Sequence, residues 1–359
     1  MRKPLGHLRN LLRFSRGATI PTMGPLKAKW EVINTCNARC KTCLHWQEKS
    51  DDTILGTEEA RMLIRQLAEA GVLSLTLTGG EPMMRRDLVE LIAFAKEQGL
   101  ITELITNGLL LSERRARDLV ESKLDTVYIS IDAANAKLND QLRGLSGYFK
   151  LAMSAVDNLK SMRRNGDLKI IIKTTVTSKN IGELVALAEL AIKKGIDGFC
   201  FQLAQIAENR KFVFDSALLI DSSNRDALIA ELDKLLLGYR ETLAGPLEYY
   251  ETLRNVLANP ACGENLRSVS GYSFAQLDAW GNVFMNPAKT RRIGTIREAS
   301  FESIWFGQAA NEIRNAEPET SLKDYLFDVT GTMSASFANL NVKRFLKVMR
   351  PILTGAKLF

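Results

Sequence analysis

Residues 28–205 alternate between segments with the periodicity of a β-strand and segments with the periodicity of a helix, and this alternation restricts the fold more than any other feature. Six strand-helix units in succession are typical of a parallel sheet. Because the crossovers are right-handed, such a sheet curls toward a barrel, and six units give a partial, open barrel rather than the full eight. The predicted strands are 29–34, 72–78, 100–106, 126–132, 169–177 and 199–203, and the predicted helices are 57–70, 87–98, 112–122, 148–165 and 181–194.

Candidate site residues lie at or just beyond the ends of the predicted strands. Cys36 follows the first strand, Gly79 the second and Asn107 the third, while Asp132 and Gln202 close the fourth and sixth. In parallel sheets of this kind the reactive groups lie beyond the C-terminal ends of the strands. We therefore expect these residues to meet at one edge of the sheet.

Three cysteines lie within eight residues, in the run Cys36-Asn-Ala-Arg-Cys40-Lys-Thr-Cys43. Five cysteines in 359 residues do not make a disulfide framework, and three in one loop suit metal ligation better than crosslinking. Three thiolates can hold three irons of a [4Fe–4S] cube and leave the fourth iron open. A structural zinc site is the alternative, but zinc needs four ligands and only His45 lies near enough to be the fourth.

A second motif, Thr78-Gly79-Gly80-Glu81-Pro82, ends the next predicted strand. Together the two motifs resemble the radical SAM superfamily, and the resemblance covers about residues 28–205. It implies a TIM-like partial (β/α)6 barrel in which Cys36, Cys40 and Cys43 ligate one [4Fe–4S] cluster. It also implies that S-adenosylmethionine chelates the open iron, is cleaved reductively, and yields a 5′-deoxyadenosyl radical that abstracts hydrogen from a substrate.

The same resemblance implies contacts to S-adenosylmethionine. Gly79, Gly80 and Glu81 would receive its amino group, because glycines let backbone carbonyls approach and Glu81 offers negative charge. Arg143 resembles the residue that meets its carboxylate. No catalytic side chain is assigned. The cofactor-binding candidates are Thr78, Gly79, Gly80, Glu81, Asn107, Ser130, Asp132, Arg143, Thr175 and Gln202.

The chain departs from the family pattern at one position of the cysteine loop. The residue before the third cysteine is often aromatic in the superfamily and packs near adenine, but here it is Thr42. His45 and Trp46 are the candidates for the aromatic ring that packs near adenine in place of that residue.

A second region resembles the SPASM or "twitch" extension. It normally carries cysteines for an auxiliary cluster, yet Met285-Asn286-Pro287 stands where a cysteine segment is expected and no cysteine follows Cys262. We expect a small α+β extension without a second cluster, which closes the barrel and shapes the pocket. Its segments are Cys262-Gly263, a hairpin over 278–284 with Gly281-Asn282 at its turn, 291–297, and a helix over 300–315.

The predicted organisation has five parts. They are an N-terminal arm (1–27), the radical SAM core (28–220), a helical connection (221–258), the extension (259–320) and a basic amphipathic tail (321–359). The tail could lie on an anionic membrane surface or cover the open edge of the barrel.

We expect an enzyme acting on a small-molecule or lipid-like substrate, because no auxiliary cysteines are present to pass an electron onward. A peptide- or protein-modifying (RiPP-type) maturase is the alternative, and a non-catalytic iron–sulfur electron-transfer protein is a third possibility. The radical chemistry would require an electron donor such as flavodoxin or ferredoxin.

Bulk composition limits partners and location. The net charge of +7 is scattered, and no basic tract with interleaved aromatics predicts nucleic-acid binding. Neither a signal peptide nor a run of about 18 apolar residues is present. A cytoplasmic protein is expected, with peripheral contact at the inner membrane face left open by the tail.

Several isolated residues have simple structural interpretations. Cys200 is predicted to be a small buried side chain, with hydrogen donation to a substrate radical as the alternative. Cys262 is predicted to be a structural or idle thiol rather than a ligand. Tyr249 and Tyr250 are expected in the interior, and His7 at the surface.

Overall fold

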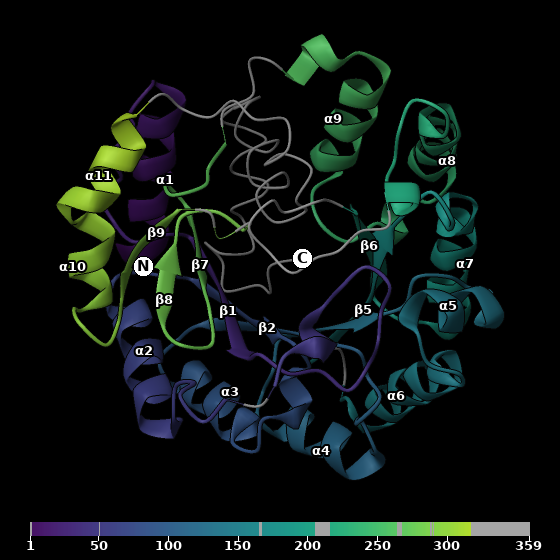
Figure 1. Cartoon of the computed structure of the whole chain (residues 1–359), viewed down its shortest axis with the longest axis horizontal. Helices are drawn as coiled ribbons and strands as arrows, with labels where there is room; N and C mark the ends of the chain where they lie inside the picture. Colours follow the sequence, from purple (N-terminus) through teal and green to yellow (C-terminus); the bar gives the residue numbers. More distant parts are fainter. Residues whose placement is uncertain are drawn as a thin grey trace.

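The computed structural model describes residues 2–49, 51–164, 167–204, 216–263, 268–287, 289 and 291–316. Its centre is a nine-stranded sheet in the order β6-β5-β4-β3-β2-β1-β7-β8-β9, and β6 and β9 are its edges (Figure 1). Strands β1 to β6 pair in parallel with their sequence neighbours, so the predicted partial barrel is confirmed. These strands are β1 Lys27–Ile33, β2 Ser74–Gly79, β3 Ile101–Thr106, β4 Thr126–Ser130, β5 Lys169–Val176 and β6 Gly198–Leu203.

Helices surround the curved sheet on its outer side (Figure 1). Those that follow the barrel strands are α2 Thr57–Glu69, α3 Leu88–Glu97, α4 Glu113–Glu121, α5 Ala136–Arg143, α6 Tyr148–Met162, α7 Leu184–Lys194, α8 Arg225–Gly238 and α9 Leu247–Ala258. Short 3₁₀ turns are η1 His45–Gln47, η2 Pro82–Met84, η3 Ile181–Glu183, η4 Ser216–Leu218, η5 Arg240–Thr242 and η6 Pro260–Gly263.

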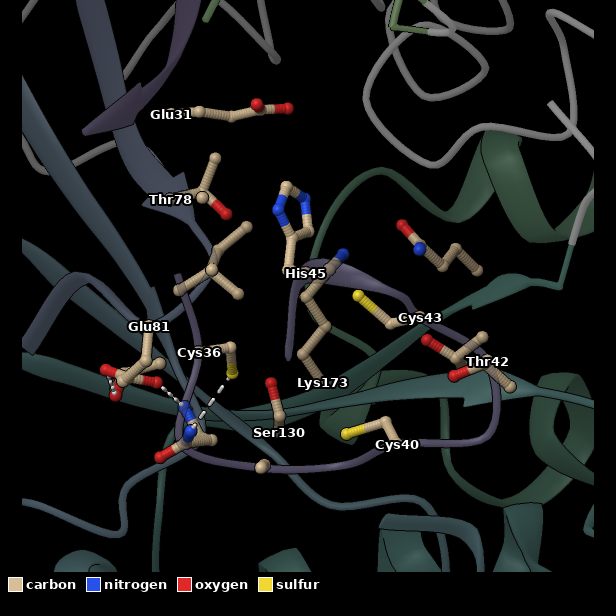
Figure 2. A pocket seen from close by; sticks show the side chains of 18 of the residues that line it. Glu31, Cys36, Cys40, Thr42, Cys43, His45, Thr78, Glu81, Ser130 and Lys173 are labelled. Carbon is tan, nitrogen blue, oxygen red and sulfur yellow. Dashed lines mark hydrogen bonds between the residues drawn. The ribbon is translucent and has the colours of Figure 1, made fainter. Parts of the chain in front are cut away.

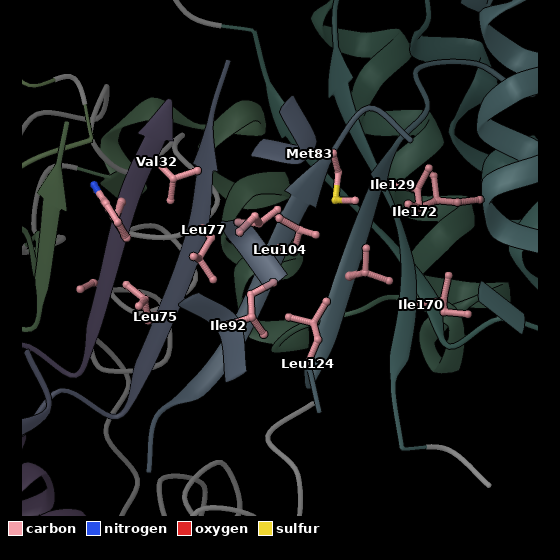
Figure 3. Close-up of a cluster of buried hydrophobic side chains, with 14 of the residues drawn as sticks. Val32, Leu75, Leu77, Met83, Ile92, Leu104, Leu124, Ile129, Ile170 and Ile172 are labelled. Atoms are coloured by element: carbon pink, nitrogen blue, oxygen red, sulfur yellow. The ribbon is translucent and has the colours of Figure 1, made fainter. Parts of the chain in front are cut away.

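Side chains alternate between the two faces of each barrel strand. The outward residues are apolar and pack under the helices to form the main core, as Leu77, Leu104 and Ile172 show (Figure 3). Burying each such side chain stabilises the fold by roughly 1.5–3 kcal/mol. The inward residues are largely polar, for example Lys29 on β1 and Thr76 on β2. The barrel interior is therefore available for binding polar groups.

The extension continues the same sheet. Strand β7 pairs in parallel with β1, and β8 and β9 follow as antiparallel neighbours. The hairpin prediction placed the turn too late: the turn lies over 278–281, and Asn282 already belongs to a strand. The reason is local, because Asp278 Oδ1 accepts hydrogen bonds from the Trp280 and Asn282 amides. The elements are β7 Phe274–Leu277, β8 Asn282–Phe284, β9 Arg292–Thr295, α10 Phe301–Phe306 and α11 Gln308–Asn315.

The N-terminal arm contains a helix, α1 Arg2–Ser15, that packs against the extension. Leu11 and Phe14 form a small core with residues just before and within β7. The surface prediction for His7 is wrong. Its side chain is 1% exposed, and Nε2 lies 2.7 Å from the carbonyl oxygen of Gly71. His7 lies one turn before Leu11 and therefore shares its buried face.

The connection predicted to be helical over 221–258 contains two helices, α8 and α9, which are separated around Gly245 and Pro246. The segment 300–315 was predicted as one helix, but it divides at Gly307 into α10 and α11. The predicted tail, 321–359, lies outside the described residues. None of the helices within the described ranges is long and apolar enough to cross a membrane.

Candidate active site

The three clustered cysteines line one cavity at the C-terminal edge of the sheet (Figure 2). Their loop leaves β1 at Ile33 and is fixed on its far side by α5, because the Lys41 amide donates to the Leu142 carbonyl at 2.9 Å. The thiols of Cys36, Cys40 and Cys43 are partly buried. One short loop therefore presents three sulfur ligands to a single space.

Two glycines bring the end of β2 against the cysteine loop. A Cβ atom on Gly80 would lie 1.8 Å from the Thr35 carbonyl oxygen, and one on Gly79 would lie 2.2 Å from that of Ile33. Gly79 also has φ +127°, which side chains rarely adopt. The amide of Gly80 donates to the Ile33 carbonyl at 2.9 Å. The backbone contact alone therefore requires glycine at both positions, whether or not a cofactor also approaches them.

Glu81 connects the ends of β2 and β3 beneath the cavity. Its Oε1 accepts from the Met83 amide at 2.9 Å and the Thr106 hydroxyl at 2.6 Å, and its Oε2 accepts from the Asn107 amide at 2.7 Å. Burial raises the pKa of this carboxyl, although all three donors oppose the shift. Glu81 thus fixes the loop after β3 while still lining the cavity.

Asn107 places an amide beside the first cysteine. Its Nδ2 donates to Asn37 Oδ1 at 2.7 Å and lies 3.9 Å from Cys36 Sγ. An N–H directed at a sulfur stabilises negative charge there, as is common around iron–sulfur clusters.

Arg143 and Asp132 form an ion pair in the wall. Arg143 Nη2 lies 2.7 Å from Asp132 Oδ1, which also accepts from the Thr175 amide at 2.9 Å. Burial disfavours the charged guanidinium, but Asp132 outweighs it and holds the pKa of Arg143 above its ordinary value. Arg143 Nη1 lies 3.9 Å from Cys40 Sγ. A positive charge is therefore fixed beside the second cysteine.

The structure brings nearly all the predicted cofactor residues together. Asp132 is the exception: it is 1% exposed and supports Arg143 from behind the cavity wall. The predicted residues that line the cavity are Thr78, Gly79, Gly80, Glu81, Asn107, Ser130, Arg143, Thr175 and Gln202.

His45 and Trp46 were the candidates for an aromatic ring near adenine, and of these two only His45 lines the cavity. Its Nδ1 lies 3.1 Å from the Asn34 carbonyl oxygen, and Figure 2 shows the ring directed toward Glu31 rather than toward the sulfur atoms of Cys36 and Cys40. Trp46 is 36% exposed and does not line the cavity.

Sequence reasoning missed the polar residues inside the barrel. Lys29, Glu31, Lys173 and Gln276 also line the cavity, and Glu31 forms a buried ion pair with Lys289. The alternation of polar and apolar residues along β1 could have predicted them, because Lys29 and Glu31 lie on the face of the strand opposite Val32.

The donor set fits an iron–sulfur cube better than a single ion. Among the described residues, no three His, Cys, Asp or Glu side chains are close enough to hold one metal ion, as a zinc site would require. In a cube each thiolate binds its own iron, so the sulfurs stand farther apart. Burial raises the pKa of Cys36 to about 12 and of Cys43 to about 11, so iron would displace their protons on binding.

Comparison with known proteins shows the family of this chain. The family model described as the radical SAM superfamily matches residues 30–201. Over 293 residues the chain is 31% identical to the Fe-coproporphyrin III synthase of Methanosarcina barkeri, and this match covers 77% of the chain and 72% of that protein. The chain belongs to the radical SAM superfamily. It is therefore a radical SAM enzyme, and its cofactors are a [4Fe–4S] cluster and S-adenosylmethionine.

Other similarities extend over different parts of the chain. The PqqA peptide cyclase of Rhizobium meliloti is 27% identical over 311 residues, which cover 80% of this chain and 76% of that protein. Six other curated relatives are matched over only 38% to 49% of their own length. The structure of SuiB from Streptococcus suis bound to S-adenosylmethionine has a TM-score of 0.66 at 16% identity, with 86% of this chain and 71% of that chain covered. That likeness shows a shared fold.

Proposed function

We propose that Cys36, Cys40 and Cys43 hold one [4Fe–4S] cluster and that this radical SAM enzyme abstracts a hydrogen atom from a small organic substrate. The observation that carries the proposal is the convergence of the three thiols and the Gly79-Gly80-Glu81 turn on one cavity. When bound, the cluster and S-adenosylmethionine supply a 5′-deoxyadenosyl radical, and the protein positions the reacting groups and excludes water.

The chain's own residues divide the work of holding S-adenosylmethionine. Backbone groups of Gly79 and Gly80 offer acceptors for its amino group at the strand end. Arg143 offers charge for its carboxylate, and Asp132 keeps that guanidinium in place. Ser130, Thr175 and Gln202 line the β4–β6 side of the cavity and are our candidates for its ribose and adenine.

Two observations favour a small-molecule substrate. One relative matched over most of both chains, the Fe-coproporphyrin III synthase, is named for a porphyrin product. No cysteine follows Cys262, and Cys262 itself is exposed, so an auxiliary cysteine-ligated cluster has no ligand set in the extension. Without a second cluster to receive an electron, the simplest reaction is one in which the electron stays at the single cluster or returns to it.

A peptide substrate is the second candidate. It is favoured by the similarity to the PqqA peptide cyclase, which also covers most of both chains. For either substrate we propose that an electron donor such as flavodoxin or ferredoxin reduces the cluster.

The test is anaerobic reconstitution with iron and sulfide, followed by incubation with S-adenosylmethionine and dithionite. We expect 5′-deoxyadenosine from the wild type and none from Cys40→Ala, whereas Cys262→Ala should match the wild type because its thiol is exposed and outside the cavity. Stimulation by porphyrin precursors or by peptides would separate the two substrate classes. A fully reconstituted wild type that binds no S-adenosylmethionine would contradict the proposal.

A further inference from the structure

The excess positive charge of the chain is concentrated in one segment. Residues 1–30 contain seven Lys and Arg residues and no Asp or Glu. The whole chain has 48 basic and 41 acidic residues, so the other 41 basic residues are matched by 41 acidic ones. Basic residues occur throughout the sequence, but the excess of +7 is therefore not scattered. A local excess of one sign favours binding to a surface of the opposite sign.

Helix α1 and the turn after it present three arginines to solvent. Leu5, Arg9 and Arg13 are spaced by four residues, so they lie in one row along the helix, and Arg16 follows in the turn. All four residues are exposed, and Leu5 is 46% exposed. The row from Leu5 to Arg13 is about 12 Å long.

The opposite face of α1 is buried inside the protein. His7 and Asn10 are each at most 1% exposed, and Leu11 and Phe14 belong to the small core against the extension. The carbonyl of Asn10 accepts a hydrogen bond from the Tyr272 hydroxyl at 2.9 Å. Figure 1 shows α1 at the periphery of the molecule, on the side of the extension. The helix is therefore fixed with its row of arginines facing outward.

Acidic neighbours do not neutralise the three arginines. No ion pair joins Arg9, Arg13 or Arg16 to any other residue within the described ranges. Arg13 lies in the last turn, where a basic side chain interacts favourably with the helix end, but this accounts for only one of the three. Like charges four residues apart destabilise a helix slightly. An anionic surface would compensate this repulsion.

Helix α1 lies at the end of the barrel opposite to the cysteines. His7 Nε2 lies 2.7 Å from the carbonyl oxygen of Gly71, which is three residues before β2, and Tyr272 is two residues before β7. The cysteine loop follows the other end of β1, and a strand of seven residues is about 20 Å long. An electron carrier bound to α1 would not contact the cysteine loop. The position of α1 therefore argues against an acidic redox protein as the partner.

We propose that α1 binds an anionic membrane surface through Arg9, Arg13 and Arg16, with Leu5 entering the headgroup layer. Anionic headgroups form an extended negative plane, which matches a row of outward charges. An exposed apolar side chain in that row is favourable at a lipid interface. The apolar face of α1 stays in the protein core, so the contact is mainly electrostatic. The inference does not depend on the proposed function, since α1 contributes no residue to the cavity.

Co-sedimentation of the whole chain with lipid vesicles tests the proposal. The protein should bind equimolar phosphatidylcholine and phosphatidylglycerol vesicles but not phosphatidylcholine alone, and added salt should weaken binding because it screens exposed charges. The triple variant Arg9→Gln/Arg13→Gln/Arg16→Gln should bind about a hundredfold more weakly, since each charge near an anionic surface contributes about fivefold. Leu5→Ser keeps all the charges and should weaken binding about tenfold through lost apolar contact.

The matched control is Arg114→Gln/Arg117→Gln/Lys150→Gln, which removes the same charge from exposed positions on α4 and α6. It should bind the anionic vesicles within a few-fold of the wild type. Urea unfolding monitored by circular dichroism checks that every variant is folded.

Three results would overturn the inference. They are a wild type that does not bind the anionic vesicles, a triple α1 variant that binds as the wild type does, and an equal loss in the control. Binding to polyglutamate in solution without binding to the vesicles would overturn it as well, because the partner would then be an acidic protein.

Discussion

Arg143 Nη2 lies 2.7 Å from Asp132 Oδ1 in the wall behind the cysteines, and both side chains are almost fully buried. The pair joins the end of α5 to the segment after β4, and the Thr175 amide connects it to β5. One ion pair therefore both stabilises the barrel rim and fixes a cation near Cys40.

Asp132→Asn should lower the free energy of unfolding by about 3 kcal/mol, because it leaves a buried guanidinium without its counter-charge. Urea unfolding monitored by circular dichroism measures the change. Asp157→Asn is the control: its ion pair with Lys194 is much more exposed and should be worth less than about 1 kcal/mol. Equal losses in the two variants would contradict the importance of burial.

Gly80→Ala should disturb the cysteine loop, since the new Cβ would lie 1.8 Å from the Thr35 carbonyl oxygen. We expect a loss of about 1–3 kcal/mol or more, together with weaker cluster retention measured as iron per chain. Gly238→Ala, at the end of α8, meets no atom within 4 Å and should be neutral or slightly stabilising. Normal iron content in Gly80→Ala would refute the proposed tight packing.

Because of the Lys27–Glu103 pair, the free energy of unfolding should decrease measurably at acidic pH. Burial disfavours the charged carboxylate, but Lys27 and the hydroxyls of Thr76 and Ser74 outweigh it and lower the pKa of Glu103. Because the folded pKa is below the unfolded value of about 4.3, the stabilisation is present above that pH and is lost as the pH falls through the folded value.

Lys27→Met tests this pH dependence by denaturant unfolding at several pH values. At pH 7 the variant should be about 3 kcal/mol less stable than the wild type, because Glu103 becomes a buried charge that has lost its cation. The difference should shrink as the pH falls through the lowered folded pKa of Glu103, because the carboxylate is then protonated in both proteins. A difference that does not vary with pH would exclude the electrostatic explanation.

Alanine substitution should separate the five cysteines into two groups. Replacing Cys36, Cys40 or Cys43 should abolish the visible absorbance of the reconstituted cluster and most of the bound iron. Cys200 is buried and Cys262 is exposed, and neither lines the cavity. Their alanine variants should keep the chromophore, and loss of iron in either one would require a different ligand assignment.

The sequence predicted the barrel because its strands are β-branched or apolar runs separated by recognisable helices. It missed α5, although Asn135 caps that helix through the Leu138 amide and Gly144 ends it in the left-handed conformation. It also missed β7, whose four residues are all buried and so show no alternation. Short elements that are stabilised mainly by tertiary packing leave a weak local pattern.

The sequence by itself determined the family and the fold class and drew attention to the three clustered thiols, because the cysteine spacing and the glycine turn are local properties of the chain. Only the tertiary structure decided that Asp132 lies behind the wall, that Glu81 holds the loop after β3, and that Lys29 and Lys173 line the same cavity. Strand order and register determine these relationships, since they decide which side chains from distant segments point inward together.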